Sequence, residues 1–177
     1  MIRRPPRSTQ GVSSAASDVY KRQWLQALPL SEHIGFTWWF PLLESIHVLA
    51  IGLVVGTILM VDLRLLGLAA VRYPASRITL ELVPWTWLGF VVAFITGFGL
   101  FMAGATRYVE NPAFQIKFML LPLAALNMAW FQFRTMRTIS SWDDATVPPT
   151  TAKLAGATSL LLWIGVLLAG RWPGHLL

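Results

Sequence analysis

The sequence predicts an all-α integral membrane protein, an up-down bundle of four transmembrane helices preceded by a short interfacial segment. Two observations lead to this fold class. The 177 residues are 55% hydrophobic and only 12% charged, with a mean hydropathy of +0.59, whereas about 25% of a soluble domain is charged. The apolar residues also gather into four long runs, and a helix of about 20 apolar residues crosses a bilayer core.

The four runs are separated by short polar connections. We expect the spans at about 38–61, 83–105, 113–133 and 154–170. Asp62 and Arg64 close the first, and Asn111-Pro112 is a helix-entry signal for the third. Short connections favour antiparallel neighbours, which gives the up-down order. The mixed polar and apolar stretch before the first span is expected to lie along the interface, within a single domain of residues 24–177.

Residues 1–23 differ in character from the rest of the chain. They are basic and serine-rich and hold no apolar run, so they lack the core of a secretory signal. The string closely resembles translated sequencing-adapter read-through. We therefore expect a disordered leader that is an artefact, and we set it apart from the functional interpretation.

The positive charge of the chain indicates a lipid bilayer as its partner, and not nucleic acid. The net charge is +6, but five of the fourteen basic residues lie in the first 22 positions and most others flank apolar runs, where membrane proteins keep them. The absence of cysteine excludes disulfides and thiolate metal sites.

Charge also predicts the orientation. With the leader set aside, the connections after the first and third spans carry six basic residues and the opposite side carries three. The positive-inside rule then places both termini in the periplasm, for a protein of the bacterial inner membrane. Counting the leader would make the terminal side the more basic one, by eight to six, and would reverse the orientation.

Small residues at four-residue spacing predict how the helices pack. They occur in the first, second and fourth spans as Gly52/Gly56, Gly89/Ala93/Gly97 and Gly165/Ala169. Such residues let backbones approach closely where lipid supplies no hydrophobic drive. The Gly52/Gly56 pair serves either packing within the bundle or a homo-oligomer.

A few ionisable residues within or beside the spans are candidate site residues, because an unpaired charge in the membrane is costly. Glu44 and His47 lie three residues apart, on one face of the first span. The antiparallel order brings Arg107 and Lys117 to the same depth. We expect Glu44 to pair with Arg107 or Lys117, which leaves His47 to bind a ligand or cofactor. The alternative is purely structural, with Arg107 and Lys117 reaching the headgroups and His47 bonded to a neighbouring helix.

Three further residues have simpler expected roles. Asp62 and Arg64 are expected to form a charge pair at a helix end, and Asn127 to hydrogen-bond between helices.

The Glu44-x-x-His47 spacing is also used by di-iron bundles, but those need it on two helices. If a metal is bound, His47 as an axial ligand of haem b is the remaining arrangement, without a second histidine in the membrane.

Several strings resemble an uncharacterised bacterial family of four-span inner-membrane proteins, a domain of unknown function. They include Glu44-Ser-Ile-His47, Val83-Pro84-Trp85-Thr86-Trp87 and Thr106-Arg107-Tyr108. A looser similarity links the chain to copper-resistance membrane proteins and the membrane protoporphyrinogen oxidase. His47 and Lys117 match an early-span histidine and a lysine of those families, but Asn127 stands where the oxidase pattern has a second histidine.

The leading functional hypothesis is therefore a non-enzymatic or accessory membrane protein that binds a small ligand or cofactor at Glu44, His47, Lys117 and Arg107. One alternative is a membrane redox protein with haem or quinone at His47. The other is a small transporter or a transport accessory subunit.

Overall fold

The computed structural model describes residues 20–21, 23–145 and 147–172, and within these ranges the protein is helical with no strand. The expected leader lies outside the described residues, apart from Tyr20, Lys21 and Gln23, which are helical. The elements that follow are α2 (Pro29–Phe36), α3 (Trp39–Leu66), α4 (Ala75–Ala103), α5 (Ala105–Glu110), α6 (Pro112–Trp130), η1 (Phe131–Thr135), η2 (Met136–Ser141) and α7 (Thr150–Arg171).

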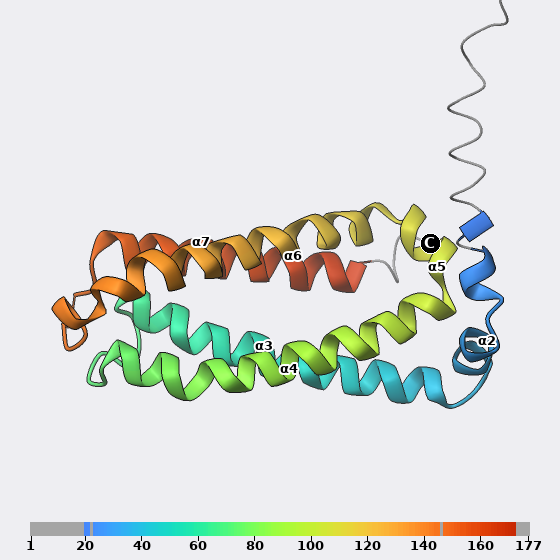
Figure 1. Cartoon of the computed structure of the whole chain (residues 1–177), viewed down its shortest axis with the longest axis horizontal. Coiled ribbons are helices and arrows are strands. Elements are labelled where there is room, and N and C mark those ends of the chain that lie inside the picture. The colour runs from blue at the N-terminus through green and yellow to red at the C-terminus, as the bar shows by residue number, and fades with distance from the viewer. Residues whose placement is uncertain (1–19, 22, 146, 173–177) are drawn as a thin grey trace, which may run out of the picture.

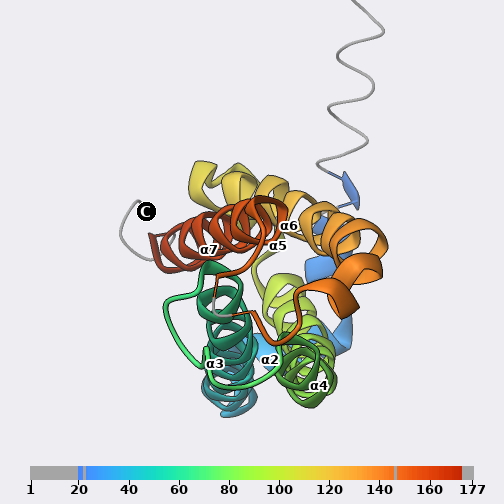
Figure 2. The same cartoon turned by 90° about the vertical axis from the view of Figure 1, so that its left-hand side faces the viewer.

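Four helices are long and apolar enough to cross a membrane, which confirms the predicted fold class. They are α3, α4, α7, and α6 continued through the π-helical η1 and the 3₁₀ turns of η2. Helix α3 packs against α4 and α7, and α6 packs against α7 (Figure 1; Figure 2).

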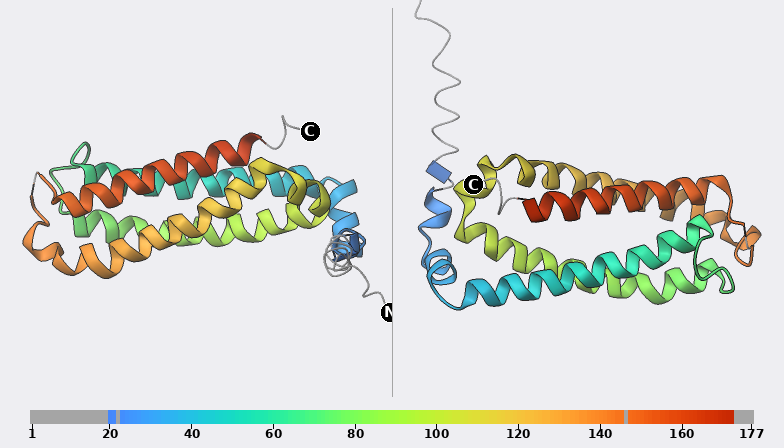
Figure 3. Two further views of the ribbon diagram at one scale, coloured as in Figure 1. Left: turned by 90° about the horizontal axis from the view of Figure 1, so that it is seen from above. Right: turned by 180° about the vertical axis from the view of Figure 1, so that it is seen from behind.

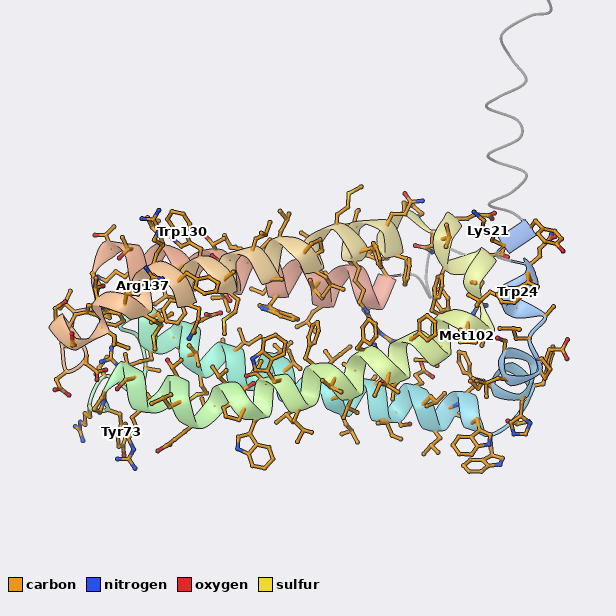
Figure 4. All side chains as sticks on the ribbon, viewed as in Figure 1. Lys21, Trp24, Tyr73, Met102, Trp130 and Arg137 are labelled. Carbon is orange, nitrogen blue, oxygen red and sulfur yellow. The ribbon has the colours of Figure 1, made fainter. Side chains whose placement is uncertain are left out.

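The two ends of the bundle differ. One, here called the loop end, holds the connections 67–74 and 142–149 (Figure 3). The other, the terminal end, holds α2 and α5 (Figure 3). Exposed aromatic side chains lie toward both ends, Trp24 beside α2 and Trp130 with Tyr73 toward the loop end (Figure 4). Such rings favour the depth of lipid headgroups.

Two helices extend beyond the predicted spans, α3 at its end and α4 at its beginning. Helix α3 continues past Asp62 to Leu66, and Gly67 ends it with a left-handed φ of 75°. The sequence predicts an end at residue 61, because a charged side chain is unfavourable in lipid. In the structure Asp62 and Arg64 are both buried within the protein, so the helix continues past them. Helix α4 begins at Ala75, eight residues before the expected start at 83, and its first turns carry an exposed Arg77–Glu81 ion pair of 2.8 Å.

Glycines mark the closest helix contacts, as predicted for the second and fourth spans. A Cβ atom at Gly89 would lie 2.9 Å from Val54 Cγ2 and 3.1 Å from the Ala50 carbonyl oxygen of α3. A Cβ at Gly165 would lie 2.9 Å from Leu120 of α6. Asn127 confirms its predicted role, because its Nδ2 donates to the Ala155 carbonyl of α7 at 3.0 Å.

Gly52 and Gly56 do not pack within the bundle, which corrects the first of their two expected roles. A Cβ atom at either position would meet nothing within 4 Å. The face of α3 that contacts α4 is the one with Ala50 and Val54, and Gly52 lies about 200° around the helix from each of these residues. A role in a homo-oligomer stays a prediction.

Arg64 ties the loop end together, and the expected ion pair with Asp62 is wrong. Its Nε donates to the Tyr73 carbonyl at 2.9 Å, and its Nη2 donates to the carbonyls of Asp143 and Ala145 at 3.0 and 3.3 Å. The Asp143 carboxylate in turn accepts from the Ser76 backbone N–H at 2.7 Å, at the start of α4. Residues two apart on a helix point about 200° apart, so Asp62 and Arg64 face different neighbours.

We predict opposite effects for two glycine substitutions. Gly89→Ala inserts a methyl group against the α3 backbone, so it should destabilise the protein by about 1–3 kcal/mol. Gly52→Ala meets open space and should be neutral or stabilise the protein by up to about 1 kcal/mol through helix propensity. Thermal unfolding in detergent measures both, and equal losses would contradict the packing described.

Arg64→Lys should destabilise the protein by about 2 kcal/mol or more, because an ammonium group cannot reproduce the fork that reaches three carbonyls. The matched control is Arg72→Lys, since Arg72 is an exposed arginine of the same end. Thermal unfolding of the two variants compares them directly. A loss at Arg72 as large as that at Arg64 would show that the carbonyl contacts are unimportant.

Candidate functional site

His47 lies about two turns into α3, and α4 holds its ring. The ring packs on Gly97, where a Cβ atom would lie 2.7 Å from His47 Cε1. His47 Nδ1 lies 3.0 Å from Thr96 Oγ1. Gly97 therefore leaves room for the ring, and the hydroxyl group of Thr96 fixes its orientation.

The hydrogen bonds of Thr96 assign the tautomer of His47. Thr96 Oγ1 donates its single proton to the Val92 carbonyl at 2.7 Å, so it accepts from His47 Nδ1–H. The proton of neutral His47 is thus on Nδ1, and Nε2 carries a lone pair. Nε2 has no side-chain partner within the described residues. It is free to accept a hydrogen bond or to ligate a metal.

Lys117 of α6 approaches the same region from the other helix pair. Its side chain is half-buried and lies against the end of α7, where a Cβ atom at Gly170 would be 3.5 Å from Lys117 Nζ. No ion pair of Lys117 occurs in the part of the chain that the structure describes. All four long helices thus contribute to the surroundings of His47 and Lys117.

The side chains of Glu44 and Arg107 are exposed, whereas those of His47 and Lys117 are half-buried. Glu44 forms no ion pair with Arg107 or Lys117 among the described residues, and the Arg107 guanidinium lies 5.6 Å from the ring centroid of its neighbour Tyr108. His47 thus lies on α3 against α4, Lys117 lies on α6 against the end of α7, and the side chains of Glu44 and Arg107 are exposed.

Thr96 and Gly97 are site residues that sequence reasoning missed. The sequence pattern places Gly97 in a stripe of small residues and does not single out Thr96. A hydroxyl beside a glycine in an otherwise apolar span was the available signal, because a hydroxyl in a membrane helix bonds to a carbonyl of its own helix or to a neighbour.

Metal ligands are sparse in the described parts of the chain. No group of three histidine, aspartate or glutamate side chains could hold a metal ion there. His33 is exposed on α2, and Asn127 is occupied by its bond to Ala155. For haem, His47 would therefore be the one histidine that the described bundle helices supply.

We predict that Thr96→Val changes the tautomer of His47. The substitution removes the acceptor of His47 Nδ1–H, so it should cost about 1 kcal/mol of stability and mix the two neutral tautomers. Histidine ¹⁵N shifts report the tautomer, and a His47→Gln variant identifies the signal among the three histidines. A wild-type His47 protonated on Nε2 would contradict the assignment.

Comparison with known proteins gives one match. Residues 34–176 match the model of a family described as a family of unknown function (DUF6644). No curated protein and no solved structure matches the chain.

Proposed function

The chain belongs to a family of unknown function (DUF6644), and we propose that it binds a small anionic ligand at His47 and Lys117. The observation that carries the proposal is the half-buried ammonium of Lys117, which has no carboxylate partner among the described residues. A charge held inside a membrane bundle costs several kcal/mol unless it is paired. An anionic ligand would supply the missing partner.

The two side chains offer complementary chemistry. Lys117 Nζ has three donors and a positive charge, and His47 Nε2 offers a lone pair. A carboxylate or phosphate group would accept from Lys117, and a hydroxyl of the same ligand could donate to His47. We assign Glu44 and Arg107 to the rim of the site and not to contact with the ligand, because both are exposed.

We further propose that the protein lies in a bacterial inner membrane with its loop end on the cytoplasmic side. The basic residues of the loop end favour the cytoplasmic side of a bacterial inner membrane for that end. The termini and the His47–Lys117 site then lie toward the periplasm, so the ligand enters from the periplasm or from the outer leaflet.

An anionic probe tests the proposal. Octanoate should raise the unfolding temperature of the detergent-solubilised protein, and octanol, which has the same chain length without charge, should not. The effect should disappear in Lys117→Met and persist in Lys153→Met, where a half-buried lysine of the loop end is removed. At 100 times its Kd a ligand stabilises by about 2.7 kcal/mol. An octanoate shift that survives Lys117→Met would refute the site.

The second candidate is a haem-linked redox protein, which the tautomer of His47 favours. Axial histidines commonly donate their other ring N–H to an oxygen acceptor and ligate through the free nitrogen. His47 would hold haem in this way, and within the described long helices a second ligand would have to be a residue other than histidine. When bound, haem would supply one-electron chemistry.

Absorption spectra distinguish the two candidates. Protein produced with haem available should be measured oxidised and then dithionite-reduced, beside His47→Ala. A Soret band that is lost in the variant would establish haem binding at His47. A featureless spectrum from folded protein would remove the haem candidate and leave anion binding as the function to test.

A further inference from the structure

A second buried ionisable group lies far from the His47–Lys117 site. Asp62 is 15 residues beyond His47 on α3, about 22 Å along the helix and near the loop end. Its side chain is only 3% exposed. Ser159 of α7 lies beside the carboxyl group, and Oδ2 has no hydrogen-bond partner within the described residues.

No countercharge faces Asp62. Arg64 points to the loop carbonyls, and Arg77 is paired with Glu81. Lys153 of α7 lies six residues before Ser159, about 9 Å along the helix and on another face. The remaining basic side chains of the loop end, Arg72, Arg134 and Arg137, are exposed. The carboxylate of Asp143, in the connection 142–149, accepts a hydrogen bond from Ser76.

The contact between α3 and α7 also excludes water. A Cβ atom at Gly156 of α7 would lie 3.0 Å from the Asp62 carbonyl oxygen and 3.1 Å from Leu65 Cβ. The two backbones therefore touch beside the carboxyl group. An ionised carboxylate without water or a countercharge costs several kcal/mol, so the group must take up a cation or a proton.

A proton fits this environment better than a metal ion. Hard metal cations are bound by about six or more oxygen ligands, many of them water. Here the side-chain oxygens are those of Asp62 and Ser159, and the close backbones leave no place for a hydrated ion. A proton needs one oxygen only, and Oδ2 is unoccupied by any hydrogen bond.

We propose that Asp62 is a proton-binding site in the contact between α3 and α7. The proton comes from water at the loop end, and an O–H bond forms at the carboxyl group, which becomes neutral. Release of the proton creates a buried negative charge, so it requires water to enter between α3 and α7. Protonation of Asp62 thereby controls how tightly these two helices dock.

Infrared spectroscopy of the whole protein in detergent tests the proposal. A protonated carboxylic acid has its own C=O stretching band, and the wild type should show one at neutral pH. The other described carboxylates are exposed, apart from Asp143, which is hydrogen-bonded to Ser76. The band should be lost in Asp62→Asn, shift in Ser159→Ala, and remain in Asp144→Asn, which alters an exposed aspartate of the same end.

The pH dependence of stability gives a second readout. The wild type should lose thermal stability as the pH rises, because deprotonation leaves a buried charge, whereas Asp62→Asn should show a flat profile. A wild type without the band, or an unchanged pH profile in Asp62→Asn, would overturn the proposal. Stabilisation of the wild type at high pH by sodium or potassium chloride, but not by choline chloride, would overturn it in favour of a metal cation.

Discussion

The simultaneous close contact of α3 with two neighbours is the constraint on which the rest of the bundle depends. Gly89 lets α4 approach one face of α3, and Gly156 lets α7 approach another. In lipid, helices associate through such packing and through polar contacts, since water does not drive apolar faces together. The α6/α7 pair joins the α3/α4 pair mainly through α7, with Asn127 and Gly165 holding α6 against that helix.

Helix α3 also carries three ionisable groups, the buried Asp62 and Arg64 and the half-buried His47, each turned toward a different neighbour. His47 faces α4, Asp62 faces α7, and Arg64 faces the two connections of the loop end. Their partners differ accordingly. Arg64 is bonded to carbonyls through Nε and Nη2, whereas its Nη1 and the Oδ2 atom of Asp62 have no hydrogen-bond partner among the described residues. Buried groups left with unused hydrogen-bonding capacity are costly, and a proton can satisfy a carboxyl oxygen.

The two proposals concern opposite ends of this helix and stand independently. The site at His47 and Lys117 combines a positive charge with a histidine acceptor, so it suits an anion. The site at Asp62 combines a carboxyl group with a serine hydroxyl in a dry contact, so it suits a proton. Because the backbone contact at Gly156 lies beside Asp62 and the His47 ring packs directly on Gly97, helix packing shapes the surroundings of both groups.

The sequence by itself determined the four spans, their antiparallel order and the role of Asn127, because apolar length and the cost of unsatisfied polar groups in lipid act locally along the chain. The site at His47 and Lys117 stays a prediction. The tertiary structure alone decided that α3 extends past Asp62, that Arg64 binds loop carbonyls, and that Gly52 and Gly56 lie away from the bundle contacts. It also decided that Thr96 orients His47 while Glu44 and Arg107 remain exposed. The physical reason is that periodicity shows which residues share a helix face, whereas the neighbour that covers each face depends on how four helices pack together.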